Sequence, residues 1–142
     1  MEPNTGNSEV YIAPLAVEDL QYWHTQCIKK ACNGSYDGCT PELVLKQLCL
    51  GEALLWELIG DRCQAIAVTQ ILQRPGGKEL WLWLLGGRGM QPYTPNMIEL
   101  MRKYGEMEGC KWFGTAALPG AARVLERTTP MRVTYHRLMM EV

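Results

Sequence analysis

The spacing of apolar residues changes along the chain and predicts a succession of strands and helices. The apolar run at 10–15 is typical of a strand, and apolar positions that recur at helical spacing through 20–33 predict an amphipathic helix. Thr40 and Pro41 form a preferred helix start, in which an N-cap residue is followed by a proline in the first turn. We therefore expect a second helix at 42–50.

The rest of the chain continues this alternation and predicts a mixed sheet. The pattern favours, in chain order, a hairpin of strands at 53–59 and 62–73, a strand at 79–85, a glycine-rich turn at 86–89, a helix at 94–109, a strand at 111–117, a short helix at 119–127 and a final strand or hairpin at 131–142. The strand at 79–85 is apolar on both faces, which is typical of a central strand covered on both sides. An antiparallel meander followed by a strand–helix–strand crossover gives an α+β fold, in which helices flank a central mixed (α/β) sheet.

The composition fits a single domain of this kind. The chain has 142 residues, of which 47% are hydrophobic and 20% charged, and a chain of this size buries roughly two thirds of its unfolded surface. We expect one domain at 10–142, preceded by a flexible polar arm at 1–9. No apolar stretch approaches the ~20 residues that span a bilayer, and the N-terminus lacks a basic segment followed by an apolar one. These features favour a cytoplasmic protein with no membrane partner.

Cysteines and charges narrow the candidate chemistry. The six cysteines contain no C-x-x-C pair and only two histidines could join them, so we expect reduced thiols and no metal site. A net charge of −1 argues against a nucleic-acid partner. Residues 1–60 carry three basic and eight acidic side chains, whereas 61–142 carry eleven and seven. The second half is the expected place for an anionic ligand, although ordinary solvated surfaces produce the same asymmetry.

The segment 86–89 is the clearest candidate for a ligand site. It reads Gly-Gly-Arg-Gly and stands between the central apolar strand and the helix that follows. Glycines let the backbone approach a ligand, N–H groups at a helix start bind phosphate, and Arg88 adds a positive charge. A Gly-Gly turn also commonly serves only to connect a strand to a helix, and both interpretations stay open at this point.

The order of elements, with Arg88-Gly89 after the central strand and a helix after them, resembles the GNAT (Gcn5-related N-acetyltransferase) superfamily. In that family a turn often written R-G-x-G holds the pyrophosphate of acetyl-CoA with its backbone amides. The resemblance covers 10–142 in topology and implies transfer of an acetyl group from acetyl-CoA to an amine. It implies a cofactor site formed by Leu84, Leu85, Gly87, Arg88, Gly89, Met90 and Asn96.

Departures from the family pattern point to a second interpretation. Met90-Gln91-Pro92-Tyr93 stands where the family has a second small residue, and Pro92 has no N–H to offer a phosphate. The segment 118–127 lacks the tyrosine that the family uses as an acid, and the chain after it is short. In these respects the chain looks like small GNAT-like proteins of tailed bacteriophages. That resemblance implies a catalytically silent protein that acts in virion structure, virion assembly or host interaction, through a protein partner or self-assembly. A small regulatory domain that binds another phosphorylated ligand at the same turn is a third alternative.

Four side chains are candidates for proton transfer in acetyl transfer to an amine. The reaction needs a base for the ammonium and an acid for the thiolate, or a site that only aligns the two reactants. The candidate bases are Glu57, Glu79 and His136, and the candidate acid is Tyr93. The bases have structural alternatives: the glutamates as solvated carboxylates at a strand edge, and the histidine as an outward-facing strand residue.

Overall fold

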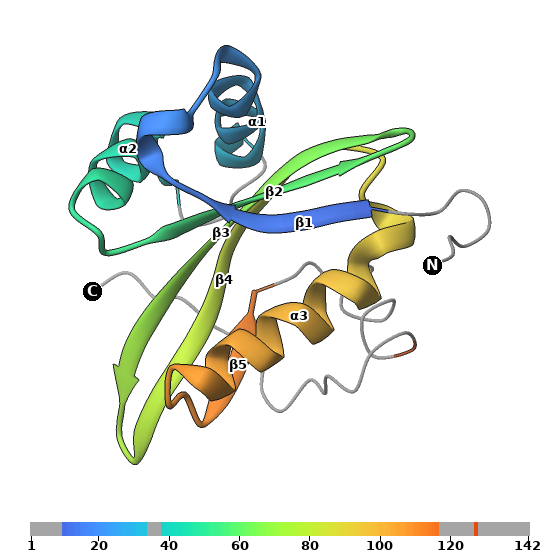
Figure 1. The fold of residues 1–142 in the computed structure, drawn as a ribbon. Helices are drawn as coiled ribbons and strands as arrows, with labels where there is room; N and C mark the ends of the chain where they lie inside the picture. The colour runs from blue at the N-terminus through green and yellow to red at the C-terminus, as the bar shows by residue number, and fades with distance from the viewer. Residues whose placement is uncertain (1–9, 34–37, 117–126, 128–142) are drawn as a thin grey trace.

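The described residues form a five-stranded mixed sheet with helices on both faces (Figure 1). The structure, a computed structural model, describes residues 10–33, 38–116 and 127. The predicted arm at 1–9, the predicted final strand with His136, and all but the last residue of the predicted helix at 119–127 lie outside these residues. In the part of the chain that the structure describes, no helix is long and apolar enough to cross a membrane.

The elements follow the predicted order closely. In chain order they are β1 (Val10–Leu15), the 3-10 turn η1 (Val17–Asp19), α1 (Tyr22–Asn33), α2 (Pro41–Cys49), β2 (Leu54–Gly60), β3 (Cys63–Arg74), β4 (Gly77–Arg88), the 3-10 turn η2 (Gln91–Tyr93), α3 (Thr94–Met107) and β5 (Trp112–Thr115). The 3-10 turns are the two elements among them that the apolar pattern does not predict. They connect longer elements and are too short to show a period.

The sheet has the predicted topology. Its strand order is β1-β2-β3-β4-β5, with antiparallel pairing from β1 through β4 and parallel pairing between β4 and β5. The parallel pair is connected through α3, as a strand–helix–strand crossover requires. The α+β fold class, an antiparallel meander followed by this crossover, is thus confirmed.

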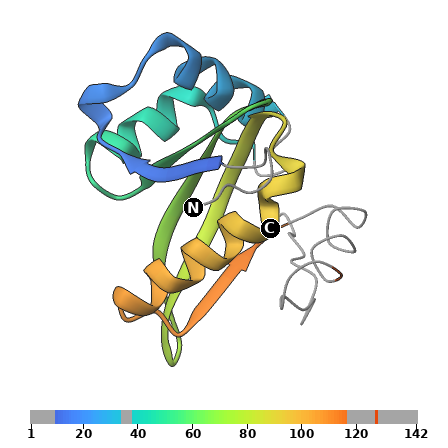
Figure 2. The ribbon, with the colours of Figure 1, turned by 45° about the vertical axis from the view of Figure 1, so that its right-hand side comes forward.

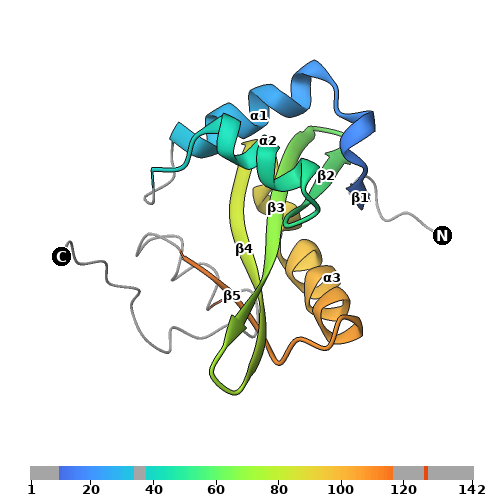
Figure 3. The same ribbon diagram turned by 90° about the vertical axis from the view of Figure 1, so that its left-hand side faces the viewer.

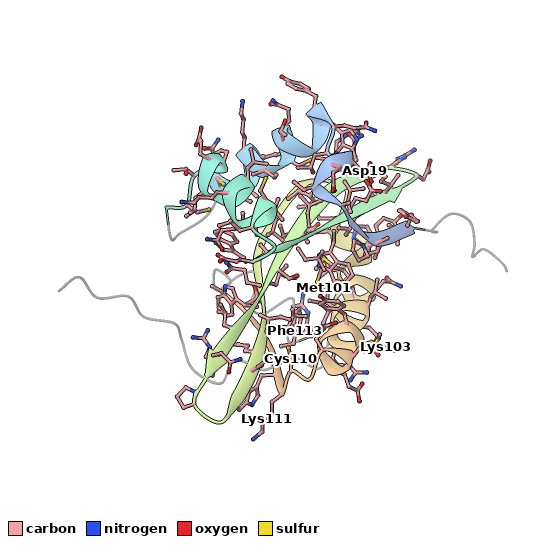
Figure 4. All side chains as sticks on the ribbon, turned by 60° about the vertical axis from the view of Figure 1, so that its left-hand side comes forward. Asp19, Met101, Lys103, Cys110, Lys111 and Phe113 are labelled. Carbon is pink, nitrogen blue, oxygen red and sulfur yellow. The ribbon has the colours of Figure 1, made fainter. Side chains whose placement is uncertain are left out.

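Two apolar clusters lie on opposite faces of the sheet. Helices α1 and α2 cover one face and α3 covers the other (Figure 3). Strand β3 serves both faces by alternation, because Ile66 and Val68 belong to the α1–α2 cluster while Ala65 and Ala67 belong to the α3 cluster. Met101 of α3 is buried in the α3 cluster, and Phe113 of β5 packs against it (Figure 4).

The predicted glycine-rich turn at 86–89 is wrong, because β4 continues through most of it. Gly86 and Gly87 pair with β3, and the strand ends at Arg88. Helix α1 explains the first glycine: a Cβ built at Gly86 would lie 2.7 Å from the Cβ of Ala31. The glycine allows a helix to pack directly on the strand. At this position a glycine in the sequence therefore indicates close packing rather than a turn.

The two threonine–proline pairs begin their helices differently. The Thr40 Oγ1 atom accepts a hydrogen bond from the Leu43 amide at 3.2 Å, so the predicted N-cap of α2 is confirmed. At α3 the N-cap residue is Tyr93, and Thr94 instead donates its hydroxyl to the Met90 carbonyl at 3.3 Å. Thr94 and Pro95 repeat the sequence pattern of Thr40 and Pro41 and predict a cap at Thr94. This prediction is wrong, because the turn η2 shifts the helix start by one residue.

This difference predicts unequal effects of removing the two hydroxyls. We expect Thr40→Ala to lower the free energy of unfolding by about 1 kcal/mol, because it leaves an amide in the first turn of α2 without its acceptor. Thr94→Ala removes no amide acceptor and should cost less. Urea unfolding of both variants tests the assignment, and equal losses would contradict it.

Candidate functional site

A β-bulge interrupts β4 near the centre of the sheet. Val68 of β3 pairs with Leu84 and the next residue, Thr69, pairs with Leu82, so Trp83 is the extra residue on β4. Leu84 is buried in the α1–α2 cluster and Trp83 packs against the same cluster. Two consecutive side chains therefore lie on one face, which a regular strand does not allow.

The parallel pairing of β4 with β5 ends at this bulge. Leu82 and Thr115 form the last pair, and the Thr115 hydroxyl donates to the Leu82 carbonyl at 2.9 Å. Within the described residues, no part of β5 pairs with β4 at 83–88. Figure 2 shows β5 beside the part of β4 that is nearer the β3–β4 turn. Among the described residues, the edge of β4 at 83–88 that faces away from β3 therefore has no strand paired with it, and we call this stretch the outer β4 edge.

The residues predicted to bind a cofactor lie along this edge of β4 and at the start of α3. The side chain of Leu84 is buried in the core and that of Leu85 packs against the α3 cluster, so both can offer a ligand mainly their backbone. Met90 also packs against the α3 cluster, whereas Arg88 and Asn96 are exposed.

Gly87 and Gly89 are required by the protein's own packing. Both have positive φ, +134° and +73°, which side-chain-bearing residues rarely adopt. A Cβ at Gly87 would overlap the backbone of Ala65, and one at Gly89 would overlap the carbonyl oxygen of Arg62. The two glycines therefore seat the end of β4 against β3, and their presence is not by itself a sign of a ligand.

The start of α3 has few backbone amides available for a phosphate. Pro92 and Pro95 have no amide hydrogen. The Tyr93 amide donates to the Met90 carbonyl at 2.9 Å, and the Thr94 amide donates to the Gln91 carbonyl. Residues 92–95 thus have no amide hydrogen free to bind a phosphate. The sequence indicated this departure from the family pattern only at Pro92.

Positive charge gathers at the C-terminal end of β4. Lys30 of α1 donates its ammonium to the Gly87 carbonyl at 3.2 Å. Burial raises the pKa of the Cys27 and Cys63 thiols, and the positive charge of Arg88 opposes that rise at both. An anion at this end of β4 would meet two cations. The raised pKa keeps both thiols protonated near neutral pH, so neither has the character of a nucleophile.

Glu79 is held in an ion pair at the β4–β5 junction. The Arg74 Nε atom donates to Glu79 Oε1 at 2.7 Å, and the Arg74 guanidinium lies 6.0 Å from the centre of the Trp81 ring. The second carboxylate oxygen faces Gly114 of β5, where any Cβ would overlap it. The Glu79 side chain is 16% exposed, so its interpretation as a solvated carboxylate is wrong.

Glu57 has a buried partner that sequence analysis did not identify. His24 Nδ1 accepts from the Gln21 amide at 2.8 Å, which places the ring proton on Nε2, and Nε2 donates to Glu57 Oε1 at 2.9 Å. The histidine is 2% exposed and its ring stacks on Trp23 at 3.8 Å. Glu57 is thus also not a solvated carboxylate. The one sequence signal for this pair is that His24 falls on the apolar face of its helix.

The structure does not bring together Glu57, Glu79 and Tyr93, the three candidate proton-transfer residues that it describes. Glu57 is opposite Ile66 on β3, whereas Glu79 is opposite Leu72, six positions further along the same strand. At about 3.3 Å per residue the two carboxylates are roughly 20 Å apart along the sheet. Tyr93 packs against the α3 cluster on the other face. Glu79 alone lies beside the β4–β5 junction.

A cavity elsewhere in the fold contains none of the candidate side chains, and the described residues offer no metal site. A cavity of about 450 Å³ lies where β1 ends and β2 begins, lined by residues such as Leu15, Leu54, Ile71 and Tyr104 and by none of the candidate side chains. Among the described residues, no group of three or more His, Cys, Asp or Glu side chains could hold a metal ion.

Comparison with known proteins identifies the fold. No known protein family matches this sequence, and no curated protein matches it. A predicted acetyltransferase from Clostridium acetobutylicum, solved with acetyl-CoA, matches with a TM-score of 0.66 at 11% identity, over 94% of this chain and 96% of that one. The ribosomal-protein-alanine N-acetyltransferase of Brucella melitensis matches with a TM-score of 0.65 at 15% identity, over 94% and 99% of the two chains. The fold is that of the GNAT acetyltransferases.

The GNAT fold extends over nearly the whole chain. A third structure, glucosamine-6-phosphate N-acetyltransferase from Arabidopsis thaliana, matches with a TM-score of 0.64 at 11% identity and covers 94% of this chain and 99% of that one. The resemblance inferred from element order is therefore confirmed for the fold. At these identities the likeness concerns the path of the chain, and the chemistry of the site has to be argued from its own residues.

Proposed function

We propose that the protein is a GNAT-type N-acyltransferase that transfers the acetyl group of acetyl-CoA to an amine. The observation that carries this proposal is the outer β4 edge at 83–88, which begins at the bulge residue Trp83, just after the last described parallel pair, Leu82 and Thr115. A strand edge that is released from its neighbour offers unpaired backbone groups to an extended ligand. A predicted acetyltransferase of similar fold was solved with acetyl-CoA, and in this protein we assign the pantetheine arm to the outer β4 edge.

The residues at the outer β4 edge fit this cofactor in two respects. The backbone of Leu84, Leu85 and Gly87 provides an edge for the pantetheine amides. Arg88 and Lys30 provide positive charge for the phosphates, in place of the amides that are committed at the start of α3. When bound, acetyl-CoA supplies the activated acyl group.

Glu79 is the candidate base. It lies four residues before the bulge residue Trp83, where β4 pairs with β5, and we expect the amine to approach the outer β4 edge from this side. Its Oε1 atom is occupied by Arg74, which fixes the carboxylate and leaves Oε2 beside Gly114 to accept a proton from the ammonium. Holding a base in one orientation reduces the entropy cost of reaching the transition state.

Thermal unfolding with and without acetyl-CoA at ~1 mM tests the cofactor site. A ligand at 100 times its dissociation constant adds about 2.7 kcal/mol to the free energy of unfolding, which raises the melting temperature by roughly 6–10 °C. We expect Arg88→Glu to remove most of that shift. Lys46→Glu makes the same change of charge on the exposed surface of α2 and should leave the shift intact.

A second candidate function is a catalytically silent GNAT-like protein of a tailed bacteriophage, acting in virion structure, assembly or host interaction. The observation that favours it is the loss of amide donors at 92–95, which removes much of the phosphate-binding turn. It predicts no shift with acetyl-CoA in a well-folded sample, together with self-association or a stable partner. Turnover of acetyl-CoA with any amine in a panel of amino sugars, aminoglycosides and peptide N-termini would exclude it.

A further inference from the structure

Two cysteine thiols meet where α1 and α2 approach each other. Cys32 lies in the last turn of α1 and Cys39 immediately precedes Thr40, the N-cap residue of α2. The Cys39 thiol lies 3.5 Å from the Cys32 sulfur. Cys32 is buried in the α1–α2 cluster, and Cys39 is half-buried against the same cluster. All six cysteines are among the described residues and none is in a disulfide.

We propose that Cys32 and Cys39 form a reversible disulfide that acts as a redox modification site, independent of any acetyltransferase activity. A disulfide bond is about 2.05 Å long, so the two sulfurs need to approach each other by only about 1.5 Å from their separation in the structure. The two other buried cysteines do not compete: burial raises the pKa of Cys27 and Cys63, which disfavours the thiolate.

The oxidant is a small-molecule disulfide such as oxidised glutathione, and the reaction is two thiol–disulfide exchanges. Cys39, the more accessible thiol, loses its proton and attacks one sulfur of the oxidant, which releases one small thiol and forms a mixed disulfide. The thiolate of Cys32 then attacks the Cys39 sulfur and releases the second small thiol. The protein loses two protons and two electrons, and the oxidant takes them up and is reduced to two thiols.

The bond would join two helices that pack on the sheet beside the C-terminal end of β4. Cys32 follows Ala31, whose side chain lies against Gly86 of β4. The closed loop is short, because the two cysteines are seven positions apart. A loop of this size restricts the unfolded chain enough to raise the melting temperature by about 5–10 °C when native geometry is kept. The oxidised protein should therefore be the more stable form.

The test equilibrates the full-length protein in mixtures of reduced and oxidised glutathione, followed by alkylation under denaturing conditions and intact mass measurement. We expect oxidation to lower the number of alkylated thiols from six to four, with no glutathione attached, and peptide mapping to recover 32 linked to 39. Reducing agent should restore all six thiols and reverse the rise in melting temperature.

Two single variants separate this pair from general thiol oxidation. Cys39→Ser should keep its remaining thiols unlinked under the same conditions, and it replaces a half-buried side chain, so folding is expected to persist. Cys49→Ser removes an exposed thiol on α2 and should still lose two thiols on oxidation. The proposal is overturned if all six thiols of the native chain resist oxidation, if Cys39→Ser still forms a disulfide, or if the reaction stops at the mixed disulfide.

Discussion

Glu79→Gln is expected to slow acetyl transfer by a factor of about 10² to 10⁴, the range associated with loss of a general base. The amide keeps the shape of the carboxylate and can still accept the hydrogen bond from Arg74 Nε, so the fold should be retained. What the variant loses is the oxygen beside Gly114 that can take up a proton. The measurement is the rate of coenzyme A release at saturating acetyl-CoA with an amine that supports turnover.

Glu57→Gln is the matched control for this prediction. It makes the same chemical change in the other partly buried glutamate, roughly 20 Å away along the sheet. The amide oxygen can accept from His24 Nε2, so we expect activity within a few-fold of the unmodified protein. If both variants kept full activity, Glu79 would not be the base, and alignment of the reactants alone would have to account for the rate.

The sequence was sufficient to predict the order of elements from β1 to β5, because each of these predictions depended on neighbouring residues. Apolar spacing located α1, alternation located β3, and Thr40 with Pro41 located the start of α2. The same local signals predicted the meander and the crossover, since short connections join neighbours in a sheet. Local patterns failed where the deciding contact came from elsewhere: β4 extends through Gly86 because α1 packs onto that glycine.

The geometry of the candidate site was harder to predict, for the same reason. The bulge arises because β4 has one residue, Trp83, more than β3 at this point of their pairing. The predicted strand at 79–85 is apolar on both faces, so its sequence pattern does not reveal the extra residue. The glutamates are candidates by residue type, but their partners come from a helix for Glu57 and from a neighbouring strand for Glu79. The spacing of residues along the chain cannot show which of the two carboxylates is the better candidate base, because the two differ in partners that long-range pairing brings to them.

Gly89→Ala is expected to be among the most destabilising single changes in the chain. The backbone at Gly89 has φ +73°, and an added methyl group would overlap the carbonyl oxygen of Arg62. Backbone strain and steric overlap together should cost about 3 kcal/mol or more. Urea unfolding monitored by tryptophan fluorescence measures the loss, and the protein has five tryptophans to report it.

Gly51→Ala isolates the steric part of this cost. Gly51 has nearly the same backbone conformation, φ +75°, but no atom lies within 4 Å of an added Cβ. We expect it to cost about 1 kcal/mol, the penalty of placing a side chain in the left-handed region. Equal losses in the two variants would show that the contact with Arg62 relaxes easily. If the losses differ as expected, Gly89→Ala alters the end of β4, and any weaker binding of acetyl-CoA by this variant would reflect that change. Arg88→Glu changes an exposed side chain instead and is therefore the better probe of the cofactor site.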